Sequence, residues 1–427
     1  MIRRLDVPPL DRLDPWLARR AGSDPATRAA VAGILDDVAA RGDEAVREYT
    51  RRFDGVDLPP AGWELPQAAW QGALERIEPR LLAALARAVE RVREYHEHQR
   101  EPGFTLTQED GSVVGMKVTP VDRVGLYVPG GKASYPSSVV MNAVPAVVAG
   151  VQEIIAVVPP TGITDAVLAA CALSGVTRIF RIGGAQAIAA LAYGTPTVPR
   201  VDKIVGPGNR WVAETKRQVV GLVGIDMIAG PTEVLVIADA TADPARVAAD
   251  LIAQAEHDED AVSWCVTPDA ALAEALPGAL ESALARAPRA AIARAALERN
   301  GLVVVVPSMR EAIEVANRRA PEHLQIVAEG ADRIGQSIRH AGAIFLGDST
   351  PEPVGDYIAG PSHVLPTGGT ARYASPLGVY DFVKRTSVIR YSAARLAEDA
   401  DAIVALAEAE GLHGHAEAVR VRGAARS

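Results

Sequence analysis

The feature that most constrains the fold is a regular alternation of short β-rich runs with amphipathic or alanine-rich segments, which begins near Val113. Parallel strands need a crossover connection of about a dozen residues or more, and a helix usually supplies it. The alternation therefore predicts parallel sheets covered by helices. The β-rich runs are DRVGLYV, EIIAVV, TRIFRI, KIVG and EVLVIAD in a first series, then VSWCV, LVVVV, LQIVA and AIFLG in a second.

The chain has 427 residues, which is too long for one ordinary hydrophobic core. Two series of strands fit this length better as two sheets than as one. The predicted fold class is α/β, with two Rossmann-like parallel-sheet domains, N-terminal helices before them and a C-terminal helical arm after them.

Helices are predicted on both sides of the strand-rich region. Asp24 followed by Pro25 is typical of a helix start, and a second helical tract is expected from about Pro79 to Arg100. Beyond Asp381 the pattern becomes helical and charged, with a helix expected over 393–409 and a histidine-bearing segment, EGLHGHAEAV, after it.

The net charge of -9 argues against a nucleic-acid or anionic membrane surface, because both need clustered positive charge. Small molecules are the expected partners. With neither a signal peptide nor an apolar run of about 20 residues, we expect a cytoplasmic protein. Cys171 and Cys265 form no CxxC pair, so any metal must be held by nitrogen and oxygen ligands. Cys265 lies in VSWCV and is interpreted as a core residue rather than a nucleophile.

Three glycine-containing loops follow predicted strands: Gly130-Gly131, Gly183-Gly184-Ala185-Gln186 and Gly206-Pro207-Gly208-Asn209. Ligands of open α/β sheets bind at this edge, and backbone N–H groups at such turns attract anions. An ordinary tight turn explains the first loop equally well. No GxGxxG motif follows any strand, so the residues alone do not indicate a dinucleotide.

Several polar residues could carry chemistry. Glu322 and His323 stand side by side before an apolar strand, as suits proton transfer, although many such pairs are incidental. Gln254 and His257 lie three residues apart at a helix end, a weak metal signal with a surface histidine as the simpler explanation. Oxygen and nitrogen ligands of this kind suit zinc or another borderline divalent ion. Other candidates lie in loops or in the arm, namely Asp356, Glu410 and His415, while His363 and His413 stay ambiguous. His96 and His98 are expected to be solvated, and His340 is expected at a polar helix end.

Taken together, these segments resemble the histidinol dehydrogenase family. The similarity extends from about Val124 to the C-terminus, and its motifs occur in family order. The matching segments are VGLYVPGGKASYPSSVVMNAVPA, RIGGAQAIAALAYGT, KIVGPGNRWVAETKR, GIDMIAGPTEVLVIAD, QAEHDEDA, RAPEHLQI, GDYIAGPSHVLPTGGTARYASPLGVYDFVKR and EGLHGHAEAV.

The resemblance implies a role for each matching position. Glu322 and His323 would be the catalytic acid/base pair. Thr232 replaces a serine that many members carry and keeps its hydroxyl. The implied zinc ligands are Gln254, His257, Asp356 and His415; the implied NAD contacts are Tyr127, Gln186 and Asn209; the implied substrate contacts are Thr232, Gln254, His257, His323, Asp356, Glu410 and His415.

The resemblance also implies oxidation of histidinol through the aldehyde to histidine, with one zinc ion per subunit and two NAD. The functional unit would be a homodimer in which the arm completes the partner's site. The implied division is an extension at 1–20, a discontinuous α/β domain at 21–126 and 235–380, an NAD-binding α/β domain at 127–234, and an exchanged arm at 381–427.

Two other functions fit the same residues less well. One is a related zinc- and NAD-dependent dehydrogenase for another small polar alcohol. The other is a metabolite-binding protein without catalysis, which would have no need of the Glu322-His323 pair.

Overall fold

The computed structural model describes residues 2–6, 24–130 and 135–423. The chain forms two compact units, one made of residues 1–99 and 121–382 and the other of residues 100–120 and 383–427. Residues 131–134, which include one glycine of the first predicted loop, lie outside the described residues, as does most of the expected N-terminal extension.

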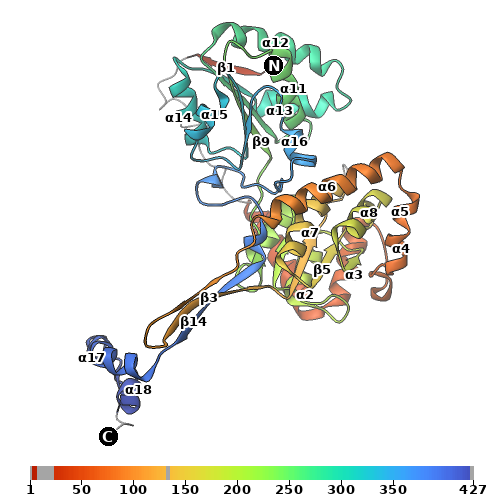
Figure 1. Cartoon of the computed structure of the whole chain (residues 1–427). Helices are drawn as coiled ribbons and strands as arrows, with labels where there is room; N and C mark the ends of the chain where they lie inside the picture. The colour runs from red at the N-terminus through yellow and green to blue at the C-terminus, as the bar shows by residue number, and fades with distance from the viewer. Residues whose placement is uncertain (1, 7–23, 131–134, 424–427) are drawn as a thin grey trace. The chain divides into compact units, whose positions relative to one another are not determined.

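The first unit contains a six-stranded sheet in which every neighbouring pair is parallel. Helices cover both of its faces (Figure 1). The strand order is β1 (Arg3–Asp6), β11 (Leu302–Val305), β10 (Val262–Thr267), β9 (Glu233–Ala238), β12 (His323–Val327) and β13 (Ala343–Leu346). One face packs against α11 (Pro244–Ala255), α12 (Ala270–Leu284) and α13 (Ala290–Asn300), and the other against α14 (Met309–Arg319) and α15 (Ala331–Gln336).

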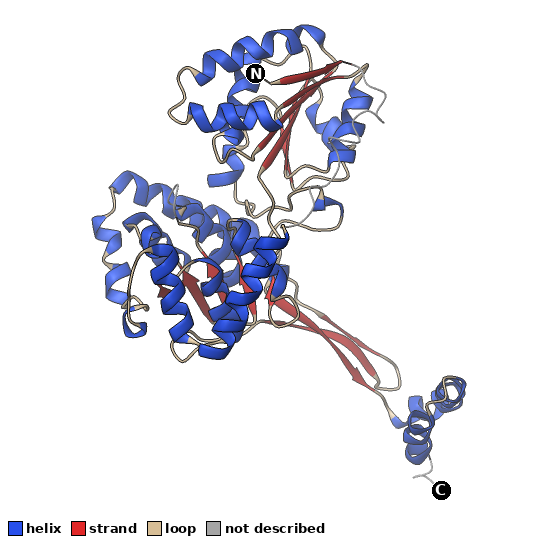
Figure 2. Cartoon of the chain, turned by 180° about the vertical axis from the view of Figure 1, so that it is seen from behind, coloured by secondary structure: helices blue, strands red, loops and turns tan. Residues whose placement is uncertain are grey.

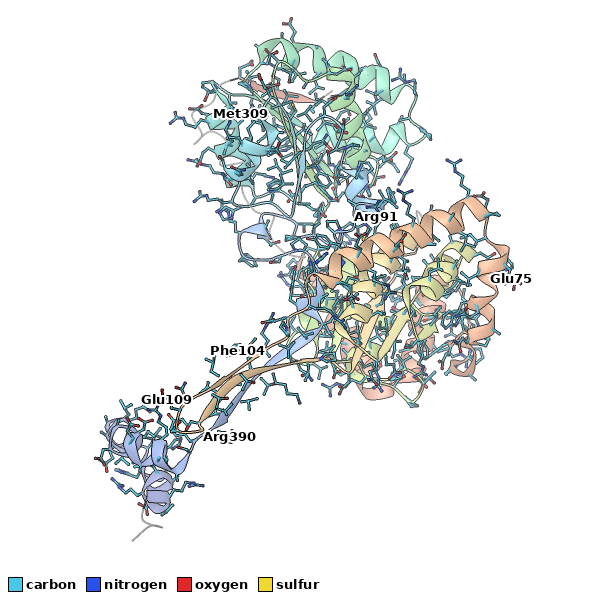
Figure 3. All side chains as sticks on the ribbon, viewed as in Figure 1. Glu75, Arg91, Phe104, Glu109, Met309 and Arg390 are labelled. Carbon is cyan, nitrogen blue, oxygen red and sulfur yellow. The ribbon has the colours of Figure 1, made fainter. Side chains whose placement is uncertain are left out.

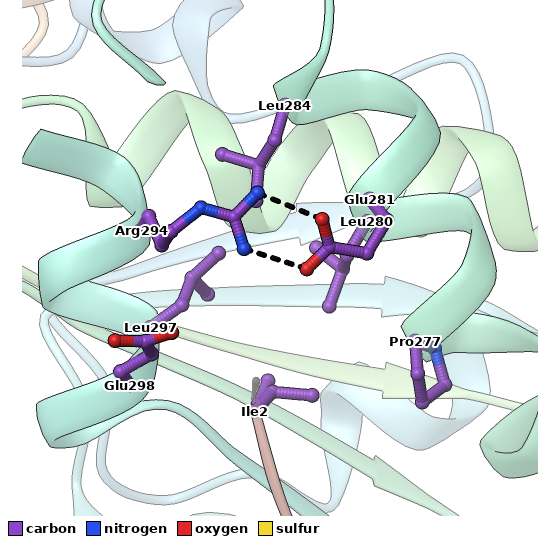
Figure 4. A pocket seen from close by; sticks show the side chains of 8 residues that line it. All are labelled: Ile2, Pro277, Leu280, Glu281, Leu284, Arg294, Leu297 and Glu298. Carbon is purple, nitrogen blue, oxygen red and sulfur yellow. Dashed lines mark hydrogen bonds and ion pairs between the residues drawn. The ribbon is translucent and has the colours of Figure 1, made fainter. Parts of the chain in front are cut away.

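Residues 3–6 were expected to belong to an N-terminal extension outside the sheets. They instead form strand β1, which pairs with β11 at the edge of this sheet. Ile2 packs beside it against α12 and α13 around a cavity of about 10 Å³ (Figure 4). The Arg294 guanidinium makes two hydrogen bonds of 2.7 Å to Glu281 across this cavity. A space of this size holds roughly one water molecule, so it is a packing feature and not a ligand site.

A five-stranded parallel sheet also belongs to the first unit, again with helices on both faces (Figure 2). Its order is β6 (Arg178–Phe180), β5 (Glu153–Val157), β4 (Arg123–Tyr127), β7 (Lys203–Val205) and β8 (Gly224–Ile225). One face packs against α4 (Gln67–Gln71), α5 (Ala73–Arg76), α6 (Pro79–Glu97), α7 (Pro136–Ala149) and α8 (Asp165–Ser174), and the other against α2 (Pro25–Arg41), α3 (Asp43–Asp54), α9 (Gly184–Tyr193) and α10 (Arg210–Gln218).

The predicted fold class is confirmed, and each of the nine β-rich runs contains a strand. Two groupings differ from expectation. The EVLVIAD run forms β9 in the six-stranded sheet, although it ends the first series. Residues 21–126 were expected with 235–380, yet α2–α6 pack against the five-stranded sheet, and β4 belongs to it. An amphipathic pattern shows that a helix buries one face but does not identify the sheet that it covers.

The second unit begins with a three-stranded antiparallel sheet. Its order is β14 (Val383–Arg390), β3 (Val113–Pro120) and β2 (Phe104–Thr107), and α17 (Ala393–Ala409) and α18 (His413–Gly423) follow. The expectation of helix directly after Asp381 was therefore wrong, although the helix over 393–409 is confirmed. Strand β14 could not be predicted from its local sequence, because its partner β3 lies more than 200 residues earlier in the chain. No helix in the described part of the chain is long and apolar enough to cross a lipid bilayer.

Candidate active site

The candidate site begins where β9 and β12 run side by side at the centre of the six-stranded sheet. The strands are parallel, with His323 in register with Val234, so both start at the same edge. Glu322 comes directly before β12 and Thr232 directly before β9. Parallel pairing therefore brings together two short sequences that lie 90 residues apart.

The Glu322 carboxylate is held in one position by its neighbours. Its Oε2 accepts hydrogen bonds from Thr232 Oγ1 at 2.7 Å and from the Glu233 backbone N–H at 2.8 Å. Burial raises the pKa of Glu322 well above its usual value, while the hydrogen bond from Thr232 opposes that rise. Thr232 Oγ1 also accepts a hydrogen bond from Gln254 Nε2, so the hydroxyl links the acid to the end of α11.

The His323 imidazole is oriented by the backbone of β9. Its Nδ1 lies 3.1 Å from the Glu233 carbonyl oxygen, which can only accept, so Nδ1 carries the hydrogen. Nε2 is then the unprotonated nitrogen, and it is buried with no hydrogen-bond partner. Burial lowers the pKa of His323 to about 4, so the ring is neutral at pH 7. A neutral imidazole with a free Nε2 can accept a proton from a bound alcohol.

Further polar groups gather around that nitrogen. Nε2 of His323 lies 3.5 Å from Glu352 Oε1 and 3.9 Å from Asp356 Oδ1. Asp356 lies in α16 (Pro353–Tyr357), and its backbone carbonyl is 3.0 Å from His363 Nδ1. His257 is close enough for its charge to lower the pKa of both His323 and His363.

The donor set fits a divalent metal ion. His323, Glu352 and Asp356 offer ligand atoms within 4.8 Å of one another. Gln254 Oε1 is buried without a partner, because the amide donates through Nε2 to Thr232 and leaves its oxygen free. An uncompensated buried acceptor is costly, and a cation would satisfy it. Nitrogen and oxygen donors of this kind suit zinc or a similar ion.

Sequence reasoning missed Glu352 and Asp250, and a spacing signal existed for both. Asp250 stands four residues before Gln254 on α11, so both lie on one helix side. Glu352, the N-cap of α16 with helical backbone angles, likewise stands four residues before Asp356. Burial raises the pKa of Glu352 to about 9 and that of Asp250 to about 6. Asp250 accepts a hydrogen bond of 2.7 Å from Gln325 Nε2.

A cavity of about 410 Å³ opens beside this cluster within the first unit. His257 and Tyr357 line it together with Tyr135, Ser137 and side chains of α6 and α7. Its volume lies in the range of small-molecule sites, and its lining combines apolar groups with a few polar ones.

The predicted NAD contacts lie at the carboxyl edge of the five-stranded sheet. Tyr127 ends β4, and its hydroxyl accepts a 3.2 Å hydrogen bond from the Gly184 N–H at the start of α9. Gln186 is fully buried, with Nε2 3.4 Å from Asp54 Oδ2 and with Oε1 unpartnered. Asn209 is exposed, and its Oδ1 caps α10 by accepting from the N–H groups of Trp211 and Val212.

The remaining predicted residues fall elsewhere. Glu410 and His415 lie in the second unit, where both are exposed. His96 is not solvated as expected, because it is fully buried on α6 and its Nδ1 lies 2.7 Å from the Val92 carbonyl. The core interpretation of Cys265 is confirmed, since the side chain is fully buried in the apolar layer under α11 to α13.

Two parallel α/β sheets, glycine loops at the carboxyl edge of one and a buried histidine–carboxylate cluster at the other define a class: an enzyme with acid/base chemistry and a nucleotide-fold scaffold. Comparison with known proteins identifies the family within this class. The family model described as histidinol dehydrogenase matches residues 17–423. The chain belongs to the histidinol dehydrogenase family.

Relatives that carry this name cover nearly all of the chain. The histidinol dehydrogenase of Burkholderia lata is 56% identical over 413 residues, which is 95% of this chain and 94% of that protein. That of Pseudomonas savastanoi pv. phaseolicola is 52% identical over 427 residues, covering 99% and 95%. The crystal structure of histidinol dehydrogenase from Elizabethkingia anophelis superposes with a TM-score of 0.93 at 33% identity, covering 99% of this chain and 98% of that one. Membership of this family implies NAD and a metal.

The buried acceptor atoms without a hydrogen-bond partner near Asp356 lead to a prediction about the metal. These atoms are Gln254 Oε1, His323 Nε2 and Glu352 Oε1. We expect His257→Ala and Asp356→Ala to lose bound zinc and turnover together, with activity falling by about a hundredfold or more, since each would remove a ligand atom of the predicted zinc set. Zinc content measured on the purified proteins, alongside activity, checks this. His98→Ala, an exposed histidine, serves as the matched control and should keep both. Full activity in rigorously metal-free wild-type protein would contradict the assignment.

Proposed function

We propose that the chain oxidises L-histidinol through L-histidinaldehyde to L-histidine, with two molecules of NAD as hydride acceptors, in the cytoplasm. The observation that carries this proposal is the His323 ring, which is neutral, fixed through Nδ1 and free at Nε2 beside the buried acid Glu322. This pair supplies the two proton acceptors that an alcohol oxidation followed by an aldehyde hydration requires. Family membership supplies the substrate.

Gln254, His257 and Asp356 would hold the zinc ion together with His415 of the partner subunit. Bound there, zinc would supply a positive charge that fixes the polar groups of the substrate and offsets the buried carboxylates. Thr232, His323 and Glu410 of the partner subunit would complete the substrate contacts. The unpartnered Oε1 of Gln254 supports the metal set, because its amide already donates to Thr232.

In the first step His323 Nε2 would take the proton of the substrate alcohol while the hydride leaves the same carbon for NAD. The product is the aldehyde, one NADH and a protonated imidazole. The hydrogen bond from Nδ1 to the Glu233 carbonyl keeps the ring in place as its charge changes. Tyr127, Gln186 and Asn209 would position the cofactor at the carboxyl edge of the five-stranded sheet.

In the second step Glu322 would take a proton from water as the water oxygen bonds to the aldehyde carbon, and the protonated His323 would return its proton to the aldehyde oxygen, which gives the hydrated aldehyde. His323, neutral again, would then take a hydroxyl proton of the hydrated aldehyde as the second hydride leaves for a second NAD. The carboxylic acid then forms. Burial keeps Glu322 a strong enough base for water, because it raises the pKa of the carboxyl group.

We further propose that the functional unit is a homodimer, because the second unit lacks a core of its own. Four large apolar side chains on one face of its three-stranded sheet are strongly exposed. One of them is Phe104, which is labelled in Figure 3. The helices that follow bury only Ala407 and Ala416. An isolated ribbon of this kind is marginally stable, so a second copy of the chain would cover it. The exposed sheet residues are Phe104 52%, Leu106 55%, Val114 42% and Ile389 69%.

Exchange of the second unit predicts complementation between inactive variants. We expect His415→Ala mixed and re-associated with His323→Ala to regain part of the wild-type activity, because one of the two hybrid sites is then intact. The measurement is NADH formation by verified heterodimers. A mixture of His323→Ala with Asp356→Ala is the matched control, since both changes fall in the first unit and no intact site forms. Heterodimers that stay inactive in the first mixture would place the arm in the site of its own subunit.

The proposed reaction also predicts its stoichiometry. Complete oxidation of a limiting amount of histidinol should give about two NADH for each histidinol consumed, because two hydrides leave the same carbon. NADH absorbance together with quantified histidine measures the ratio. A ratio near one with aldehyde as the product, or no NADH at all, would refute the proposed reaction.

The separate contacts of Glu322 and His323 predict different losses in the two steps. Glu322→Gln keeps the shape but removes the base for water, so it should slow oxidation of the aldehyde by about a hundredfold or more and oxidation of the alcohol much less. His323→Asn should slow both steps by a similar factor. Single-turnover NADH formation from histidinol and, separately, from histidinaldehyde distinguishes them. Equal losses on both substrates for Glu322→Gln would contradict the division of roles.

A further inference from the structure

One buried ion pair lies outside the chemistry described so far. Lys216 of α10 pairs with Asp226, which follows β8, and their side chains are only 3% and 1% exposed. Burying two opposite charges is often no better for stability than packing two apolar side chains of the same size. The pair therefore requires an explanation beyond its mutual attraction.

Both members of the pair bind the same residue, Gly206. The Lys216 ammonium donates to the Gly206 carbonyl oxygen at 3.0 Å, and the Gly206 N–H donates to Asp226 Oδ2 at 2.8 Å. Gly206 is itself buried. A buried residue outside a strand must find one donor and one acceptor for its backbone, and this ion pair supplies both.

The backbone conformation and the position of Gly206 are both tightly restricted. Its φ of +111° lies where residues other than glycine are strained, and an added Cβ would lie 2.3 Å from the Tyr127 carbonyl oxygen. Two residues on, a Cβ at Gly208 would lie 2.4 Å from Val212 Cγ1. The loop from Gly206 to Asn209 is thus pressed against the end of β4 on one side and against α10 on the other.

We infer that Lys216 and Asp226 are positioning residues for the dinucleotide, which act by clamping Gly206 so that Asn209 and Tyr127 keep a fixed spacing. This inference rests on the proposed function, in which NAD lies against Tyr127, Gln186 and Asn209. Both charged side chains would act through their hydrogen bonds to Gly206. A preformed loop lowers the cost of ordering on binding, so the clamp contributes to NAD affinity rather than to the chemical steps.

Strand β7, which leads into Gly206, offers a matched control. Lys203, at the amino end of β7, donates to the Asp381 carbonyl oxygen at 2.6 Å and lies 3.0 Å from Asp381 Oδ1. Its side chain is 14% exposed. Lys203→Met thus removes a largely buried lysine–aspartate pair from the strand that leads into Gly206, but at the opposite end from the loop.

The test uses the full-length, metal-loaded protein. We expect Lys216→Met and Asp226→Asn to raise the KM and the Kd for NAD by about tenfold or more, while the KM for histidinol stays within about twofold and kcat falls by about threefold at most. Lys203→Met should lower the thermal stability and leave the Kd for NAD within about twofold. NAD titration by calorimetry and steady-state kinetics with each substrate varied give these values.

A double variant separates stability from positioning. Lys216→Met combined with Asp226→Leu removes both charges together, so it should fold even where a single change leaves an unpaired buried charge. Its NAD affinity should still be weakened by about tenfold. A folded double variant with wild-type NAD affinity, or an equal loss of affinity in Lys203→Met, would overturn the clamp alone. Wild-type protein that binds no NAD would overturn the clamp and the proposed function together.

Discussion

The backbone pairing of β9 with β12 is the constraint on which the candidate site depends. It places His323 in register with Val234, so the Glu233 carbonyl is within reach of the imidazole and the Glu233 N–H within reach of the Glu322 carboxylate. One peptide strand thus orients both members of the acid/base pair. A slip of one residue would turn His323 to the opposite face of the sheet and separate it from Glu352 and Asp356. Both strands are buried throughout, so the polar side chains of His323 and Gln325 depend on the hydrogen bonds that this register gives them.

The charge balance of the cluster explains why it needs a cationic ligand. Glu322, Glu352 and Asp356 converge on His323, whose ring is neutral at pH 7. The Arg319 guanidinium forms an ion pair with Glu233, so this cation is already paired with a carboxylate outside the group around His323. Burial raises the pKa of both Glu322 and Glu352, which means that their charged forms are poorly solvated. A bound metal ion or a substrate ammonium would stabilise these charged forms.

The candidate residues of the two parallel sheets lie at opposite edges of those sheets. Tyr127, Gly184 and Gly206 lie at the carboxyl edge of the five-stranded sheet, as is usual for cofactors in open α/β sheets. Glu322 and His323 lie at the amino edge of the six-stranded sheet. Helix α11 runs back between β9 and β10, and it therefore delivers Gln254 to this amino edge. A site can form at the amino edge because the helix ends and loops that carry the candidate ligands also lie at this edge.

The sequence by itself determined the fold class, nine of the eleven strands of the two parallel sheets, and the family, because these depend on local periodicity and on motifs that are contiguous along the chain. It also identified Glu322, His323, Gln254, His257 and Asp356 as candidates. Only the tertiary structure decided that α2–α6 cover the five-stranded sheet, that β14 pairs with β3, and that Glu352 joins His323. Each of these depends on contacts between segments far apart in sequence or on the desolvation of a side chain. Local periodicity records which face of an element is buried, but the partner that buries it is chosen by packing of the whole chain.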